Sequence, residues 1–286
     1  MPAVTGSSLV RLATVRPVGD DRPPRVSVLI GCWNNADTLR VAADSILGQT
    51  VADLELLIVD DGSTDATPQL AAELRAADDR VRYLPLPHIG ISGSLNAGLR
   101  EARAEFVAFQ DADDWSLPNR LETELAVLDR RPEVVVIGCR MREVDSRGAE
   151  LAPRTTFAAG DVNGALMRFN PIPNSCAVVR RQTTLDVGGF AVRYRYAMDY
   201  DLWLRLAERG RIATLDETLA VRVMGGTNVA ARNERAQTLE AIQIRLIALG
   251  RRRTVRGAGG LVLPLVSLAT PLTLKRAVRR RAGQAP

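Results

Sequence analysis

Residues 106–114 read Phe-Val-Ala-Phe-Gln-Asp-Ala-Asp-Asp, an apolar run followed by three aspartates. A short run rich in valine and aromatic residues is typical of a buried β-strand, here over 106–109. The acidic cluster from Asp111 to Asp114 would therefore begin where this strand ends. Two earlier runs, 26–30 and 54–59, show the same design of an apolar strand followed by polar residues.

Helical segments separate these runs along the chain. Asp37 can cap the first helix, and Thr67-Pro68 places a proline in the favoured first turn of the second. The expected helices cover 37–49, the segment from Thr67 onward, 92–104 and the segment from Pro118 onward, and further strands are expected at 81–84 and 134–138. This alternation predicts an α/β fold with a single, Rossmann-like, mostly parallel sheet flanked by helices.

Ligands of such sheets bind in the crevice beyond the carboxyl ends of the strands. This rule places three polar clusters on one rim: Trp33-Asn34, Asp60-Asp61 and Asp111 to Asp113. Their convergence at strand ends is the strongest physical indication of a binding site in the sequence.

The second half of the chain is less regular. Strands are expected over 174–179 and 219–223, a helix over 199–207, and a later helix from the apolar stripe Leu239, Ile242, Leu246 and Leu249. The expected organisation is a flexible N-terminal extension over 1–24, a folded domain over 25–249 and a basic, partly apolar and helical tail over 250–286.

Charge is distributed unevenly between the domain and the tail. Residues 250–286 hold nine basic and no acidic side chains, so the remainder of a chain with net charge +5 is mildly acidic. This distribution argues against a nucleic-acid-binding face on the domain. The three cysteines, Cys32, Cys139 and Cys176, lie in apolar runs that we interpret as strands, without the spacing of a zinc site, and we expect buried thiols.

Carboxylates at the strand ends suggest metal chemistry. Asp111 and Asp113 can reach one ligand, and their hard oxygen atoms suit Mg²⁺ or Mn²⁺ holding a diphosphate. Asp60 and Asp61 could accept hydrogen bonds from a base or ribose, and one carboxylate of the pair Asp199 and Asp201 could act as a general base. Each also has a structural interpretation, as an acidic turn or a helix cap. Neither a phosphate-binding GxxxxGK loop nor a GxGxxG loop follows any strand.

Taken together, these segments resemble the bacterial-type family 2 glycosyltransferases, from about Val26 to Thr227. The matching segments are 26–30 with Trp33-Asn34, 45–50, 56–65, 94–98, 111–114 with Pro118 and Arg120, 188–190, and 199–204. The order and spacing of these motifs are far more specific than any one of them.

The resemblance implies a GT-A fold and inverting, metal-dependent transfer of a hexosyl or other glycosyl group. Residues 25–115 would bind the nucleotide-sugar and 116–249 the acceptor. The nucleotide-binding residues would be Trp33, Asn34, Asp60, Asp61, Asp111 and Ala112, with Asp61 at the nucleobase, Asp60 supporting its loop and Asp111 near the ribose. Asp113 would ligate Mn²⁺ or Mg²⁺, Asp199 would be the catalytic base, and Asp114, Asp201 and Trp203 would support the site or the acceptor.

Two positions depart from the family pattern. Met198 stands where the family has the glutamate of a Glu-Asp pair, and Met224 where a histidine follows Arg222 by two residues. The only histidine, His88, we interpret as a loop residue that borders the nucleotide.

The resemblance also suggests partners and a location. We expect a UDP-sugar donor, with GDP- and dTDP-sugars as alternatives, a glycan or lipid-linked acceptor, and no nucleic acid. The apolar part of the tail is too short to span a bilayer, and its flanking arginines suit an anionic membrane surface. With no visible secretory signal, we expect a cytoplasmic protein, peripheral on the inner face of the membrane. The alternatives are a nucleotidyltransferase and a nucleotide-binding pseudoenzyme at the membrane.

Overall fold

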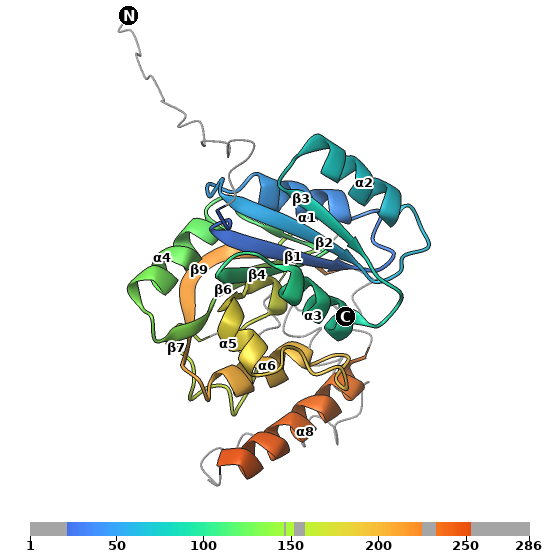
Figure 1. Ribbon diagram of the computed structural model, residues 1–286. Coiled ribbons are helices and arrows are strands. Elements are labelled where there is room, and N and C mark those ends of the chain that lie inside the picture. Colours follow the sequence, from blue (N-terminus) through green and yellow to red (C-terminus); the bar gives the residue numbers. More distant parts are fainter. Residues whose placement is uncertain (1–21, 146, 152–157, 225–232, 253–286) are drawn as a thin grey trace, which may run out of the picture.

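The computed structural model describes residues 22–145, 147–151, 158–224 and 233–252. In this part of the chain nine strands form one sheet in the order β3-β2-β1-β4-β8-β6-β9-β5, with β7 paired to β9 (Figure 1). The strands are β1 (Val26–Cys32), β2 (Leu54–Asp60), β3 (Val81–Pro85), β4 (Phe106–Asp111), β5 (Asp114–Ser116), β6 (Val134–Val144), β7 (Gly160–Asp161), β8 (Val178–Arg180) and β9 (Arg211–Val223).

Helices cover both faces of the sheet. They are α1 (Leu39–Leu47), α2 (Thr67–Ala77), α3 (Ile91–Glu101), α4 (Arg120–Arg130), the 3₁₀ helix η1 (Asn174–Cys176), α5 (Arg181–Asp186), α6 (Met198–Leu206) and α8 (Glu234–Arg252). In Figure 1, α1 and α2 lie above the sheet and α3, α6 and α8 below it. The predicted α/β architecture is therefore confirmed.

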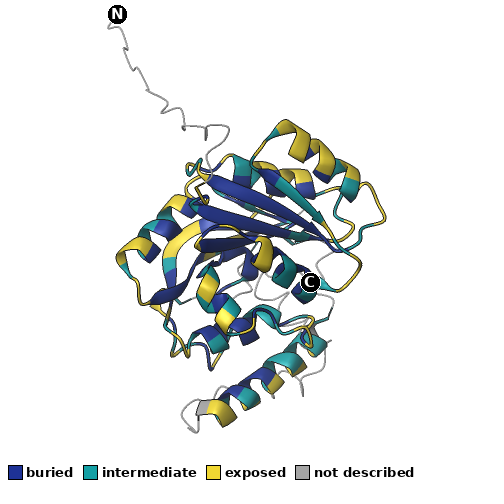
Figure 2. Ribbon diagram, viewed as in Figure 1, coloured by how far each residue is buried: buried dark blue, intermediate teal, exposed yellow. Residues whose placement is uncertain are grey.

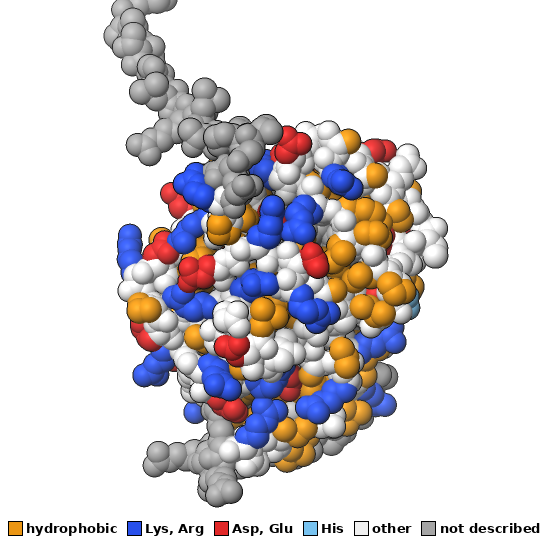
Figure 3. Space-filling view, in the orientation of Figure 1, with side chains coloured by type: hydrophobic (Ala, Val, Ile, Leu, Met, Phe, Trp, Pro, Cys, Tyr) orange, Lys and Arg blue, Asp and Glu red, His pale blue; other side chains and the backbone are white. Residues whose placement is uncertain are grey.

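Successive side chains of each strand point to opposite faces of the sheet, and a hydrophobic core forms on each face. On β1, Val28 and Ile30 pack with α1, α2 and α4, whereas Leu29 packs with α3 and α6 on the other face. Strands buried on both faces are expected to be apolar throughout, and β1, β2 and β4 in Figure 2 are almost wholly buried while the outer helix faces are exposed. Basic and acidic side chains are interspersed over the face seen in Figure 3.

The first half of the sheet matches the expected parallel order. β1 pairs in parallel with β2 and β4, and β2 with β3. The second half is mixed, because β8 is antiparallel to both β4 and β6 while β6 and β9 are parallel. β5, which was not predicted, pairs antiparallel to β9 directly after the acidic turn.

Several predicted boundaries were wrong. The strand expected over 174–179 is instead η1 followed by β8, because the segment after Pro171 and Pro173 turns at Asn174 before it joins the sheet. Asp37 does not cap α1, since the helix begins at Leu39 after a turn on the Asn35 carbonyl oxygen. Cys176 lies in η1 and not in a strand, although all three cysteines are buried free thiols, as expected.

The described structure overlaps only slightly with the expected N-terminal extension and the expected tail. α8 runs to Arg252, past the expected boundary after residue 249, and packs Ile244 and Ala248 into the core. Within the described ranges, no helix is both long and apolar enough to cross a bilayer. The expected extension over 1–24 and the expected membrane-associated tail lie almost entirely outside the described residues.

Candidate active site

The ends of β1, β2 and β4 meet at one edge of the sheet. Cys32 is in register with Asp60, and Gly31 with Asp111, so the predicted rim forms as expected. β1 lies between the other two strands in the sheet: the chain runs from β1 through β2 to β3 on one side and then crosses to β4 on the other. Such a switch in strand order is where α/β sheets open a crevice for ligands.

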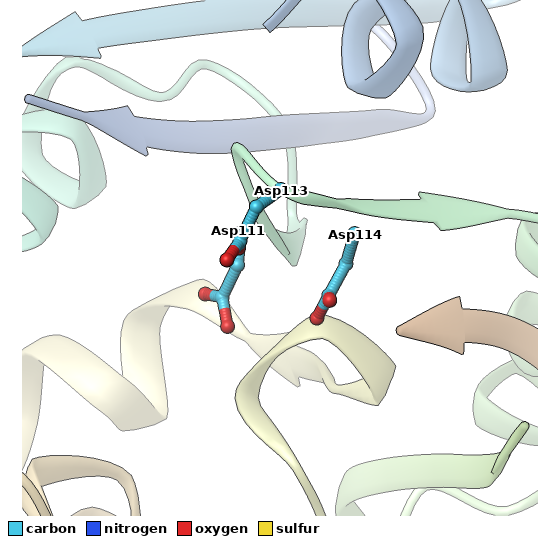
Figure 4. Close-up of side chains that lie close together, drawn as sticks. All are labelled: Asp111, Asp113 and Asp114. Carbon is cyan, nitrogen blue, oxygen red and sulfur yellow. The ribbon is translucent and has the colours of Figure 1, made fainter. Parts of the chain in front are cut away.

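The acidic turn between β4 and β5 gathers three carboxylates. One carboxylate oxygen from each of Asp111, Asp113 and Asp114 lies within 4.8 Å of the others. The side chains of Asp111 and Asp113 lie next to each other, and Asp114 points alongside them (Figure 4). Asp111 and Asp113 are half-buried, whereas Asp114 is fully buried, and Ala112 between them packs into the core.

Arg222 supplies the positive charge that faces this cluster. It is the cross-strand partner of Asp114 in the β5–β9 pair, and its Nη2 lies 3.4 Å from Asp114 Oδ2 and 3.8 Å from Asp111 Oδ2. One guanidinium against three ionised carboxylates leaves two negative charges uncompensated.

The pKa values show the effect of this crowding. Burial raises the pKa of Asp114 to about 7 against the opposing effect of Arg222, and burial together with Asp111 raises the pKa of Asp113. A buried carboxylate resists ionisation unless a cation or hydrogen-bond donors stabilise the charge. An oxygen-rich, negatively charged cluster of this kind fits Mg²⁺ or Mn²⁺.

Residues 170–175, which we call the bridging segment, hold the carboxylates in place. Asn174 Nδ2 donates to Asp111 Oδ1 at 2.8 Å. Ser175 Oγ accepts from the Asp111 N–H at 3.0 Å and donates to Asp114 Oδ2 at 2.6 Å. Asn170 Nδ2 donates to Asp199 Oδ2 at 2.9 Å. One short segment therefore orients carboxylates from two distant parts of the chain.

Asp199 lies in the first turn of α6, half-buried. Burial raises the pKa of its carboxyl to about 6, although hydrogen bonds from the Tyr200 N–H and Asn170 favour the charged form. Asp111 raises this pKa and Arg222 lowers it, so Asp199 shares an electrostatic environment with the acidic turn. A carboxylate with a pKa near 6 is suited to proton abstraction at neutral pH.

An exposed aromatic pair marks the end of the rim beside β1. The Trp33 ring is 50% exposed and stacks on His88, with 4.8 Å between ring centroids and 28° between planes. Asn34 adopts a left-handed conformation (φ 55°), and its Oδ1 accepts from the Thr64 N–H at 2.8 Å. Asn34 thus ties the loop after β1 to the loop after β2.

Asp60 and Asp61 are buried and bonded to protein groups. Asp60 accepts from the Ser63 N–H and the Tyr83 hydroxyl. Asp61 accepts from the Ile89 and Gly90 N–H groups and from Ser94 Oγ, at 2.7 to 2.9 Å. His88 Nδ1 also lies 2.9 Å from Asp61 Oδ2, so protein groups surround this carboxylate.

Gly62 permits the close approach of the two loops that these bonds require. Its φ is +76°, and a side chain there would meet the His88 N–H at 2.9 Å. The 88–94 loop and the start of α3 are therefore held against the end of β2.

Two of the residues expected to support the site or the acceptor are buried and bonded to protein groups. Trp203 is fully buried and donates through Nε1 to the Ile172 carbonyl oxygen at 2.9 Å, which anchors the bridging segment. Asp201 is buried in an ion pair with Arg205 on another side of α6. Asp114 is a member of the carboxylate cluster itself. Two residues depart from the family pattern. Met198 is half-buried and is the first residue of α6, and the N–H of Met224 donates to the Val144 carbonyl oxygen.

Sequence reasoning missed Asn170, Asn174 and Ser175, and it treated Arg222 only as part of a motif. The signal at 170–174 was a pair of asparagines around Pro171 and Pro173, where a rigid loop is more probable than the strand that was predicted. For Arg222, the signal was a basic residue within the apolar strand expected over 219–223.

The geometry can be compared with known proteins. Residues 27–199 match the family described as Glycosyl transferase family 2. The chain belongs to this family. It is therefore a glycosyltransferase, and the resemblance identified in the sequence is confirmed.

Bacterial relatives agree with this family. The chain is 30% identical over 207 residues to the amylovoran biosynthesis glycosyltransferase AmsE of Erwinia amylovora, covering 71% of this chain and 77% of that protein. It is 32% identical over 194 residues to the putative glycosyltransferase EpsE of Bacillus subtilis, covering 65% of this chain and 68% of that one.

Solved structures agree on the fold. TarS of S. aureus (residues 1–349) matches with a TM-score of 0.63 and 21% identity, over 79% of this chain and 65% of that one. The mannosyltransferase PcManGT of Pyrobaculum calidifontis, in complex with GDP-Man and Mn²⁺, matches with a TM-score of 0.60 and 20% identity, over 96% and 84%. The GT-A architecture predicted from the sequence is thereby confirmed.

Replacing Arg222 should reveal the repulsion among the carboxylates of Asp111, Asp113 and Asp114. We expect Arg222→Gln to lower the free energy of unfolding by about 3 kcal/mol, because it leaves buried carboxylates without their partner. The loss should be larger at pH 8 than at pH 5.5, since Asp114, whose pKa is about 7, is protonated at the lower pH and then adds no charge to the cluster. Urea unfolding at both pH values measures this loss of stability. Arg40→Gln, which removes an exposed ion pair with Glu73, is the control. Equal losses at both pH values would contradict this account.

Proposed function

We propose that the chain transfers a glycosyl group from a nucleotide-diphosphate-sugar to an acceptor hydroxyl with inversion, assisted by a divalent cation. The observation that carries this proposal is the bridging segment, which bonds to both the acidic turn and Asp199. A charge-stabilising cluster and a separate carboxylate base are thereby held around one crevice, as a single displacement requires.

The donor class is supported by structural neighbours. TarS was solved in complex with UDP and with UDP-GlcNAc, and PcManGT with GDP-Man and Mn²⁺. We favour a UDP-sugar here, with GDP- and dTDP-sugars as alternatives. The exposed ring of Trp33, stacked on His88, offers a flat surface for the base, and Asp60, Asp61 and Asn34 maintain the loops around it.

Asp113 is the proposed primary ligand of the cation, with Asp111 and Asp114 beside it. The three carboxylates fit a hard divalent ion, because their charge exceeds what Arg222 can balance. Mn²⁺ or Mg²⁺ at this position would neutralise the charge that develops on the departing nucleoside diphosphate without a proton. Asp111 is also placed to approach the ribose.

Asp199 is the proposed catalytic base. Its carboxylate would take the proton of the acceptor hydroxyl as the hydroxyl oxygen attacks the anomeric carbon opposite the leaving group, which inverts the configuration there. Asn170 holds one carboxylate oxygen and leaves the other, Oδ1, bonded only to the N–H of Tyr200 among the described residues. Asp201 is tied to Arg205 and is a weaker candidate.

The acceptor is proposed from the relatives. AmsE is named for the biosynthesis of amylovoran, which suggests a glycan or lipid-linked precursor as the acceptor for this chain too. We propose that the enzyme works in the cytoplasm, peripheral on the inner face of the membrane through its basic tail. Binding to vesicles with and without anionic lipid tests this location.

A product assay tests the proposed function. The protein is incubated with Mn²⁺ and UDP-GlcNAc or GDP-mannose, and the released nucleotide is identified by chromatography. We expect nucleoside diphosphate, and a glycosidic product whose anomeric configuration by NMR is opposite to that of the donor. Pyrophosphate release would indicate a nucleotidyltransferase, and nucleotide binding without any turnover a pseudoenzyme.

The pH profile tests the role of Asp199. Because the base must be ionised, the rate of the wild type should fall as pH decreases through about 6. Asn170→Ala removes a donor that favours the ionised form, so the acid limb should move to higher pH, with a greater loss at pH 6.5 than at pH 8. Asp199→Asn should be at least ~10²-fold slower at every pH. Superimposable normalised profiles for wild type and Asn170→Ala would place the base elsewhere.

A further inference from the structure

One polar atom beside the carboxylates has no hydrogen-bond partner in the described part of the chain. Asn174 is only 6% exposed, and its side-chain oxygen Oδ1 makes no hydrogen bond among the described residues. A buried amide oxygen without a donor is unfavourable, and such atoms in folded proteins call for a physical reason. A ligand that donates to this oxygen would supply one.

The orientation of the Asn174 amide is fixed by its neighbour. Its nitrogen donates to Asp111 Oδ1 at 2.8 Å, and rotating the amide by 180° would place its oxygen against a carboxylate. The acceptor Oδ1 is therefore the atom left over, and since it shares a carbon with Nδ2 it lies beside the Asp111 carboxylate.

Backbone contacts keep Asn174 in this position. It begins η1, whose Asn174 carbonyl oxygen accepts from the Ala177 N–H, and Ser175 follows with bonds to Asp111 and Asp114. At the other end of the bridging segment, Asn170 binds Asp199. The unpartnered oxygen thus lies on the element that joins the acidic turn to Asp199.

We propose that Asn174 binds substrate, with Oδ1 accepting a hydrogen bond from a sugar hydroxyl. This inference rests on the proposed function, which brings hydroxyl-bearing substrates to this crevice. An amide oxygen accepts but cannot donate, so the chemistry it recognises is an O–H group. That group can come from the sugar of the donor or from the acceptor, and the two sources are separated by experiment.

The test begins with the donor that the wild type turns over, so failure of the proposed function would already be visible there. We expect Asn174→Ala to reduce kcat/KM for transfer about 10- to 100-fold, because it removes a substrate hydrogen bond. Affinity for free UDP or GDP with Mn²⁺, measured by calorimetry, should fall less than transfer does, since the lost bond to Asp111 affects both but neither nucleotide carries the transferred sugar. Asn119→Ala, on an exposed residue whose side chain does not cap α4, is the matched control.

Two arms distinguish the source of the hydroxyl. If the donor supplies the hydroxyl, the slow hydrolysis of the nucleotide-sugar without acceptor should decrease together with transfer. For the deoxy donor analogue that lacks this hydroxyl, Asn174→Ala should then cause no further loss of transfer. If the acceptor supplies it, hydrolysis is unchanged and KM for the acceptor rises. Either pattern supports the proposal.

Other results would overturn it. A loss of Mn²⁺-dependent UDP or GDP affinity as large as the loss of transfer would mean that Asn174 only positions Asp111 or the cation. Transfer at the wild-type rate would mean that Oδ1 contacts no substrate. Thermal unfolding of Asn174→Ala and of the smaller change Asn174→Ser verifies that the variants compared are folded, and Asn174→Ser should show the same selective loss.

Discussion

Repulsion among three carboxylates beside one arginine is the constraint on which this site depends. Asp111, Asp113 and Asp114 follow each other at the end of β4, where burial weakens their hydration and raises the pKa of Asp113 and Asp114. Arg222 reaches two of them from the neighbouring strand. Because unpaired buried charge is costly, such an arrangement persists when a cation or substrate stabilises it.

The fold around the acidic turn can be understood as support for this arrangement. β8 inserts antiparallel beside β4 and brings the bridging segment to the turn, while β9 brings Arg222 through its pairing with β5. Trp203 anchors Ile172 from α6, the helix that begins at the proposed base. The bridging segment packs with α6 in one core, and its hydrogen bonds reach both the acidic turn and Asp199, although Asp113 and Asp199 are 86 residues apart.

The sequence predicted those parts of the fold that depend on local pattern. Apolar runs located β1, β2, β3 and β4, and the rule that ligands bind beyond strand ends placed the rim, because buried parallel strands have a composition of their own. β6 and β9 proved longer than predicted, since their outer ends carry polar residues that only pairing keeps extended.

The supporting residues of the site could not be predicted in the same way. Asn170, Asn174 and Ser175 act through contacts with residues 29 to 64 positions distant, which no sequence periodicity can reveal. Likewise, nothing local showed that Asp61 is bonded to the 88–94 loop or that Trp203 is buried. The acidic residues of the sequence were enough to locate the site, whereas the contacts within the site depend on tertiary packing.

The dependence of nucleotide affinity on Mn²⁺ tests the central claim most directly. Calorimetric titration of the wild type with UDP and with GDP should show at least ~10-fold tighter binding of one of them with Mn²⁺ than with EDTA, because the ion joins the diphosphate to the cluster. Asp113→Asn should abolish this difference, and Asp186→Asn, on an exposed residue of α5, should preserve it. Equal affinity with and without Mn²⁺ in the wild type would contradict the claim that these carboxylates hold a cation for the nucleotide.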